Sequence, residues 1–255
     1  MTSAKIAEKP VLKLENICKS FGGVVAADHI SLEVFPGEVV GLIGPNGSGK
    51  TTLLNMISGI YSADSGNLFF EGRKITRTST HHRAKLGIAR TFQHPRLLGR
   101  CDIFTNLQVG KDLARRKSDA QRGGADLSLQ TLLEAAGLES VNLGESIEKL
   151  SYGQQKLLEI VRALIARPKV MLVDEPAAGL NEKEMEFIVR LIRLAVDGGI
   201  GVVIIEHSMD LIMSICDRIT VLNFGKQIAT GVPEEVQMNQ EVINAYLGGD
   251  QDADD

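Results

Sequence analysis

The stretch Val39-Val40-Gly41-Leu42-Ile43-Gly44-Pro45-Asn46-Gly47-Ser48-Gly49-Lys50-Thr51-Thr52 decides the fold. Its first five residues predict a buried strand, and a helix is expected from about Lys50 to Ser58. Between them lies the pattern G-x-x-x-x-G-K-[S/T], whose glycines let backbone N–H groups face phosphate oxygens. The strand–turn–helix context therefore predicts a nucleoside-triphosphate site, with Lys50 on the β- and γ-phosphates and the Thr51 hydroxyl on Mg²⁺.

A second apolar run, Val170–Val173, ends in two acids, Asp174 and Glu175. Because parallel strands end at one edge of their sheet, these carboxylates are expected beside the phosphate loop. Asp174 suits the Mg²⁺ shell, and Glu175 is placed to accept a proton from the attacking water or to orient it. The alternative is that the two acids merely cap the segment that follows the strand.

The composition is that of a single large globular domain. The chain has 255 residues, of which 44% are hydrophobic and 24% are charged, and its net charge is -4. This balance gives no basic field for nucleic acid. The three cysteines, Cys18, Cys101 and Cys216, are far apart, which fits a reducing compartment. The start is polar and no run approaches about 18 apolar residues, so we expect neither a signal peptide nor a membrane span.

The remaining patterns predict an α/β fold with a helical insertion. The other expected strands are Val11–Ile17, Ile30–Val34, Asn67–Glu71, Ile88–Phe92, Gly201–Ile205, Arg218–Leu222 and Gln227–Thr230. The other expected helices are Asp102–Arg116, Leu127–Ala136, Tyr152–Ala166, Glu182–Ala195 and two short ones before Leu247. Continuous apolar strands separated by a helix indicate a parallel sheet covered on both faces. A basic, glycine-containing stretch at residues 115–124 is expected to form an exposed loop.

The segment Leu150-Ser151-Tyr152-Gly153-Gln154-Gln155 opens one of these helices. Ser151 is expected to cap the helix, with Gln154 completing a capping box, and a helix start of this kind can also bind an anion. Together with the phosphate loop and the Asp-Glu pair, the segment resembles the signature of the ABC ATPase family. That signature usually reads Leu-Ser-Gly-Gly-Gln, and Tyr152 replaces its first glycine. The resemblance extends from about Val11 to Leu247.

The resemblance implies a P-loop NTPase core of the ABC ATPase type, with an antiparallel β subdomain and an inserted helical subdomain. It implies one domain at residues 11–247, with the catalytic core at 11–93 and 168–247. The helical signature subdomain would span 94–167, and 248–255 would form an acidic tail. The activity implied is ATP hydrolysis coupled to transmembrane transport, with ATP and Mg²⁺ as cofactors.

The resemblance also assigns roles to single residues. It implies that Phe21 stacks on adenine, that Gln93 reaches Mg²⁺ and the attacking water, and that His207 contacts the γ-phosphate. The expected catalytic residues are Glu175, His207 and Gln93, and the expected metal ligands are Thr51, Gln93 and Asp174. The expected nucleotide contacts are Phe21, Gly44, Pro45, Asn46, Gly47, Ser48, Gly49, Lys50, Thr51, Thr52, Ser151, Gly153 and Gln154.

Two departures from the family pattern come after the acid pair Asp174-Glu175. Ala178-Gly179-Leu180-Asn181 matches the loop through which two subunits communicate, but Asn181 stands where Asp is common. Asn181 is also a sound N-cap, with Glu184 as its capping-box partner. Ser208 follows His207, where related importers often carry Asp.

The family implies several partners. A head-to-tail dimer, of two identical or two different cassettes, would clamp ATP between one phosphate loop and the other chain's signature helix. Integral membrane permease subunits, and indirectly a periplasmic solute-binding protein, would complete the transporter, without nucleic acid. The chain would lie in the cytoplasm, peripheral on the inner face of the cell membrane.

Several stretches, such as Arg90-Thr91-Phe92-Gln93-His94, are similar to the subset that serves branched-chain or hydrophobic amino acid importers. Urea importers and lipopolysaccharide exporters use closely similar ATPases and stay open as alternatives, as does the direction of transport. Two further alternatives are a soluble ABC ATPase acting on DNA or ribosomes and a nucleotide-binding regulator that does not hydrolyse ATP.

Overall fold

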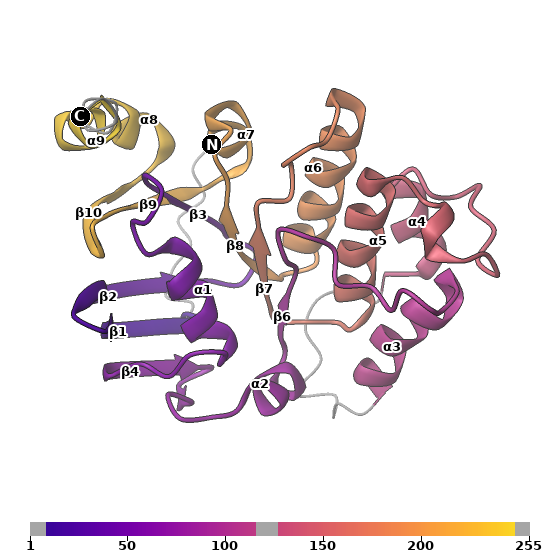
Figure 1. Ribbon diagram of the computed structural model, residues 1–255, viewed down its shortest axis with the longest axis horizontal. Coiled ribbons are helices and arrows are strands. Elements are labelled where there is room, and N and C mark those ends of the chain that lie inside the picture. Colours follow the sequence, from indigo (N-terminus) through magenta and orange to yellow (C-terminus); the bar gives the residue numbers. More distant parts are fainter. Residues whose placement is uncertain (1–8, 116–126, 248–255) are drawn as a thin grey trace.

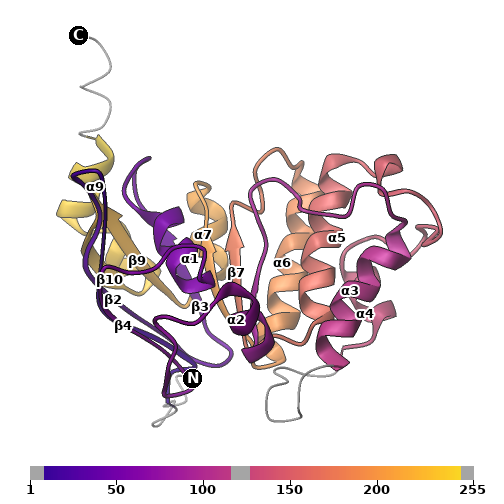
Figure 2. The ribbon, with the colours of Figure 1, turned by 60° about the horizontal axis from the view of Figure 1, so that its bottom comes forward.

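A computed structural model describes residues 9–115 and 127–247 of the chain. Most of the basic loop expected at 115–124 and the acidic tail expected at 248–255 lie outside the described residues. Figures 1 and 2 show an antiparallel sheet at one end of the molecule and a cluster of helices at the other, with a mostly parallel sheet that runs from beside the antiparallel sheet towards these helices.

The central sheet has the strand order β10-β9-β3-β8-β7-β6. All neighbouring pairs are parallel except β10 and β9. Its strands are β3 (Val39–Ile43), β6 (Ile88–Arg90), β7 (Val170–Asp174), β8 (Gly201–Ile205), β9 (Arg218–Asn223) and β10 (Lys226–Gly231). Every residue of β3, β7 and β8 is buried, which explains why these strands are continuous apolar runs in the sequence.

The second sheet is antiparallel, with the order β2-β1-β4-β5. Its strands are β1 (Leu12–Phe21), β2 (Val24–Val34), β4 (Ser65–Phe70) and β5 (Arg73–Lys74). β1 and β2 form a hairpin around Gly22 and Gly23, both of which have positive φ. Pairing across this turn extends both strands beyond the ranges expected from the sequence, which stopped at Ile17 and resumed at Ile30.

The helices cover the central sheet and build the far end of the molecule. They are α1 (Lys50–Ser58), α2 (Thr80–Leu86), α3 (Ile103–Arg115), α4 (Leu129–Ala135), α5 (Tyr152–Ile165), α6 (Glu182–Asp197), α7 (Met209–Ile215), α8 (Pro233–Gln237) and α9 (Gln240–Leu247). Helices α3, α4 and α5 gather at the end away from the antiparallel sheet, with α6 beside α5 (Figures 1 and 2). Helices α2 and α7 were not expected from the sequence.

Two hydrophobic clusters lie on opposite faces of the central sheet, because successive side chains of a strand point to opposite sides. From β7, Met171 and Val173 join the cluster that contains α5 and α6. Val170 and Leu172 join the other cluster, which holds α1 and the antiparallel sheet. The phosphate-loop helix is therefore packed between the two sheets. Within the described residues, the helices are all too short or too polar to span a bilayer.

Candidate functional site

The phosphate loop joins β3 to α1 with the bounds expected from the sequence. Two of its glycines are required by close backbone packing. A Cβ on Gly44 would lie 2.0 Å from the carbonyl oxygen of Leu222, and a Cβ on Gly49 would lie 2.2 Å from that of Ala26. Gly49 is also the N-cap of α1 and offers no side-chain cap, so the first N–H groups of the helix are available to an anion.

Polar groups inside the loop fit a phosphate. Lys50 is buried, and its Nζ donates to the carbonyl oxygens of Gly44 at 2.7 Å and Pro45 at 2.9 Å. Burial lowers the pKa of Lys50, and the carboxylates of Glu175 and Asp174 oppose that shift, so the three charges share one site. In the described part of the chain, the buried Ser48 Oγ has no hydrogen-bond partner, which leaves this hydroxyl available to a phosphate oxygen.

Asp174 ends β7 at the same edge of the sheet and is held by Arg90 of β6. Arg90 Nη2 donates to Asp174 Oδ2 at 2.9 Å. Its Nη1 donates to Asn55 Oδ1 at 2.6 Å and to Ser58 Oγ at 3.1 Å, both on α1. Burial raises the pKa of Asp174, and the hydrogen bond and charge of Arg90 oppose the rise. One arginine thus connects the carboxylate to the phosphate-loop helix.

The three residues expected to be catalytic meet around one carboxylate. Gln93 Nε2 donates to Glu175 Oε2 at 2.8 Å, and His207 Nε2 lies 3.1 Å from Glu175 Oε1. A cleft of about 200 Å³ holds Glu175 and His207 together with residues 46–52 of the phosphate loop and 24–26 of β2. The loop and the acids therefore lie side by side, as the sequence predicted.

A further acid, Glu206, holds two of the loops and was missed by the sequence analysis. The side chain is buried, with Oε1 accepting from the backbone N–H of Ala177 at 2.6 Å and Oε2 from that of His207 at 3.0 Å. Its signal was present, because Glu206 follows the apolar strand β8 just as Asp174 ends β7. Glu206 fixes the backbone of His207 relative to the segment after Glu175.

The signature segment opens α5 with the expected capping box. Gln154 N donates to Ser151 Oγ at 3.1 Å, and Ser151 N donates to Gln154 Oε1 at 2.9 Å. A Cβ on Gly153 would lie 2.1 Å from Glu184 Oε1, so a side chain there would displace the glutamate. Among the described residues that line the cleft, none comes from the signature segment.

The capping box expected at Asn181 is confirmed. Glu184 N donates to Asn181 Oδ1 at 3.0 Å, and Asn181 N donates to Glu184 Oε2 at 3.1 Å. The residue that departs from the family's usual Asp therefore has a structural role at the start of α6.

Phe21 lies at the end of β1 with 41% of its surface exposed. Its ring packs edge-on against Tyr61, with centroids 5.2 Å apart, and Lys19 Nζ lies 5.1 Å from the ring centroid. Residues 24–26, which begin β2 just after the turn, line the cleft. The exposed ring is near the cleft in sequence, and its contact with adenine stays a prediction.

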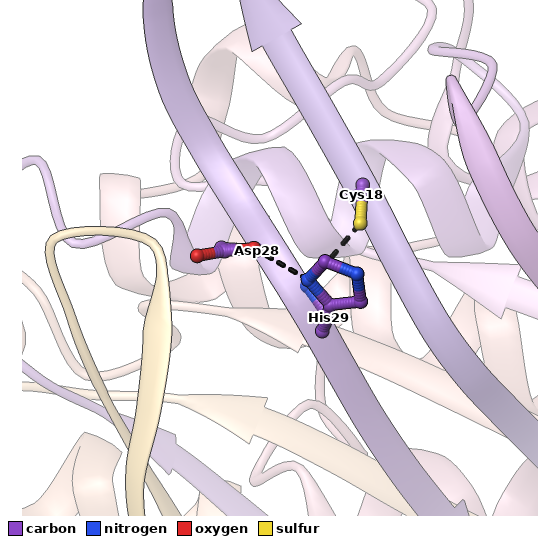
Figure 3. A group of neighbouring side chains, drawn as sticks. All are labelled: Cys18, Asp28 and His29. Atoms are coloured by element: carbon purple, nitrogen blue, oxygen red, sulfur yellow. Dashed lines mark hydrogen bonds and ion pairs between the residues drawn. The ribbon is translucent and has the colours of Figure 1, made fainter.

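A second group of titratable side chains lies on the β1–β2 pair. Figure 3 shows Cys18, Asp28 and His29 on the two neighbouring strands, and their potential metal-ligating atoms are all within 4.8 Å of one another. His29 Nδ1 lies 2.6 Å from Asp28 Oδ1, and Lys226 Nζ lies 3.7 Å from Asp28 Oδ2. The hydrogen bond to His29 holds the pKa of Asp28 below its usual range. Because this carboxylate already faces an ammonium, we interpret the group as a polar contact between strands.

The chain matches known proteins over most of its length. A family profile described as ABC transporter matches residues 27–178, and one described as branched-chain amino acid ATP-binding cassette transporter matches residues 226–252. The high-affinity branched-chain amino acid transport ATP-binding protein BraF of Pseudomonas aeruginosa is 38% identical over 253 residues, covering 94% of this chain and 98% of BraF. The corresponding protein LivG of Escherichia coli is 36% identical over 258 residues, covering 94% and 98%.

Solved structures agree with this match. The ADP conformation of MJ1267, an ATP-binding cassette of an ABC transporter, superposes with a TM-score of 0.81 at 33% identity. The superposition covers 94% of this chain and 100% of MJ1267.

Proposed function

The chain belongs to the ATP-binding subunits of the ABC transporter family, and from this premise we propose that it hydrolyses ATP to drive a branched-chain amino acid importer. The observation that carries the proposal is the meeting of Gln93, Glu175 and His207 beside the phosphate loop. Support for the solute comes from BraF and LivG, which are named for high-affinity branched-chain amino acid transport.

The phosphate loop supplies the binding of ATP. With ATP bound, the N–H groups at the start of α1 would face the phosphates, and the Ser48 hydroxyl would donate a hydrogen bond to a phosphate oxygen. Lys50 would move from the loop carbonyls to the β- and γ-phosphates. Thr51, Gln93 and Asp174 offer hydroxyl, amide and carboxylate oxygens, which are ligands that suit Mg²⁺. Bound there, the ion would neutralise charge on the phosphate oxygens.

Hydrolysis is assigned to the carboxylate of Glu175. It accepts a proton from the attacking water while the water oxygen bonds to the γ-phosphorus and the bond to the β–γ bridging oxygen breaks. Gln93 and His207, on either side of the carboxylate, fix its direction. The products are ADP and inorganic phosphate.

The signature segment is proposed to serve a partner cassette. Ser151, Gly153 and Gln154 stand outside the described lining of this chain's own cleft. The N–H groups of Ser151 and Gln154 are used in the capping box, so the donors proposed to meet ATP held by a second subunit are the Ser151 hydroxyl, the Gly153 N–H and the Gln154 side-chain amide. We propose that the chain acts in a dimer, identical or mixed, which docks on membrane permease subunits at the inner face of the membrane. The proposed division is a core at 11–93 and 168–247 and a helical signature subdomain at 94–167.

The substitution Glu175→Gln tests the proposed reaction. We expect ATP to bind with unchanged affinity and steady turnover to fall by about 10²–10⁴, the range for a lost general base. The control Glu186→Gln changes an exposed acid on α6 and should leave turnover intact. Normal turnover in Glu175→Gln would remove this carboxylate from the mechanism.

The solute is tested with the permease subunits that co-purify with the chain. The chain and these permease subunits are reconstituted in proteoliposomes. The ATPase activity of the complex should rise when a periplasmic binding protein loaded with leucine, isoleucine or valine is added. Stimulation by urea alone, or by lipopolysaccharide alone, would assign the chain to another transporter.

A further inference from the structure

Two side chains on one face of α5 contact the loops that carry Gln93 and Glu175. Tyr152 and Lys156 are four residues apart, so they project from the same side of the helix. Tyr152 Oη donates to the carbonyl oxygen of Gln93 at 3.0 Å. Lys156 Nζ donates to the carbonyl oxygen of Glu175 at 2.7 Å. The side chains of Gln93 and Glu175 are hydrogen-bonded to each other, and the backbone carbonyl groups of both residues are therefore bonded to α5.

Lys156 is an unusual residue for a helix in this position, because only 3% of its surface is exposed. Besides Glu175, its ammonium donates to the carbonyl oxygens of Ala178 at 3.0 Å and Pro176 at 3.3 Å. These three acceptors match the three protons of an ammonium. Burial lowers the pKa of Lys156, and the surrounding carboxylates, Glu206 and Glu175 first, oppose the shift. The ammonium group of Lys156 thus holds the segment that follows β7 through three hydrogen bonds.

The backbone of Glu175 needs such support. Its φ is 45°, in the left-handed region that residues with a side chain rarely adopt. Conformations of this kind persist only where the surroundings fix them. The N–H of Glu175 donates to the carbonyl oxygen of Ile205 in β8 at 2.9 Å, and its carbonyl oxygen accepts from Lys156. The residue is thus held from the sheet on one side and from α5 on the other.

Tyr152 completes the contact between the loops. Its ring faces Gly179, where a Cβ would lie 3.6 Å from the ring, and Lys156 Nζ lies 5.4 Å from the ring centroid. The glycine that is usual at this signature position has no group that could reach Gln93. Tyr152, which departs from the usual glycine, therefore adds a hydrogen bond between the signature helix and the backbone of Gln93.

We propose that Tyr152 and Lys156 are positioning residues, which fix the backbones of Gln93 and Glu175 so that the carboxylate of Glu175 points at the attacking water. The inference rests on the proposed ATPase function and deepens it. It also makes the signature helix part of its own chain's hydrolytic site, since Tyr152 is adjacent to Ser151, the residue offered to the partner's nucleotide.

The substitution Lys156→Met tests this role, because it keeps the length of the side chain and removes its donors. A misplacement of about 1 Å can cost about 10² in rate, so we expect kcat to fall by about 10–100-fold. The affinity for ATP should stay within about twofold, because the phosphate loop is untouched. Lys149→Met, at an exposed lysine just before the signature, is the control and should behave as wild type.

A double mutant separates positioning from a general structural role. In a Glu175→Gln background, Lys156→Met should cost less than about twofold, because it acts through the carboxylate already removed. The same large loss in both backgrounds would overturn the proposal. Where Lys156→Met does not fold, Tyr152→Phe serves, since it removes one hydroxyl from a partly exposed ring. We expect a fall of about 3–10-fold in kcat with ATP affinity retained.

The outcomes distinguish this inference from the function on which it rests. If Glu175→Gln is slow while Lys156→Met and Tyr152→Phe both turn over normally, only the positioning role is wrong. If Glu175→Gln itself turns over normally, the proposed hydrolysis and the positioning role are both overturned.

Discussion

Replacing Arg90 with methionine would leave Asp174 buried without the cation that donates a hydrogen bond to it. The pair is joined at 2.9 Å, and each side chain is 7% exposed. The same substitution removes the two hydrogen bonds from Arg90 to Asn55 and Ser58, which connect β6 to α1. Both the carboxylate expected at the metal and the helix behind the phosphate loop would lose a contact.

The size of the effect follows from the burial. Breaking a buried ion pair from one side costs about 3–5 kcal/mol, because the remaining charge keeps its desolvation penalty and loses its partner. For a chain of this length, each kcal/mol lowers the melting temperature by about 2 °C. We therefore expect Arg90→Met to melt about 6–10 °C below the wild type. The difference should shrink as the pH falls, since a protonated Asp174 no longer needs the cation.

The assay is urea and thermal unfolding of the full chain without nucleotide. Asp174→Asn in the Arg90→Met background removes both charges and should recover part of the lost stability, which a double-mutant cycle measures. Arg190→Met, at an exposed ion pair on α6, is the matched control and should change the unfolding free energy by less than about 0.5 kcal/mol. An Arg90→Met protein as stable as the control would refute the reasoning.

Three other predictions concern the loop and the buried thiol. Lys50→Ala removes a charged donor and should weaken ATP binding by about 10–100-fold in a titration, so wild-type affinity would contradict the site. Gly49→Ala should reduce ATP binding and stability more than Gly47→Ala. Both glycines have positive φ, but only a Cβ at Gly49 would meet backbone, 2.2 Å from the carbonyl oxygen of Ala26. Equal losses would show that the backbone strain of positive φ alone decides. Burial raises the pKa of Cys216 to about 12, so at pH 8 mass spectrometry should find Cys216 alkylated only after unfolding. The stability of the fold should fall as the pH rises from about 9 towards 12, because the unfolded thiol loses its proton first. Alkylation at the same rate in native and unfolded protein would contradict this.

The sequence predicted the parts of the site that are encoded by a few consecutive residues. The bounds expected for β3 and α1 are confirmed, because an apolar strand, a glycine turn and a helix are each encoded within a few residues. The order of the motifs along a parallel sheet was enough to expect Glu175 beside the phosphate loop. The same logic, applied to the residue after β8, would have found Glu206.

Other elements depend on contacts that no local pattern reveals. Helix α2 has only seven residues and is fixed by Arg83, which is 2% exposed. Its guanidinium donates to the carbonyl oxygens of Met56 and Ile57 in α1 and of Ile75 and Thr76 before α2. In the sequence, Arg83 is an ordinary charge in a polar stretch.

The same limit applies to the residues that support the site. In the sequence, Arg90 is a charged residue at the end of an expected strand, and Lys156 is a charged residue of an expected helix. Their roles appear only when β6, β7 and α5 are placed together. Tyr152 could be recognised as a departure from the family pattern. Its contact with the carbonyl oxygen of Gln93 could not, because it depends on how α5 packs against the loop after β6.

The position of β3 in the central sheet has a consequence for biosynthesis. Its neighbours on both sides, β8 and β9, are encoded far downstream. At about 5–20 residues per second, the ribosome needs about 10–40 s to add the residues that separate Ile43 from Asn223. Both edges of this apolar strand lack their partners until β8 has been made, and one edge lacks its partner until β9 follows, which exposes the strand to association with other nascent chains. A holdase that covers residues 39–43 during translation should therefore raise the yield of folded protein.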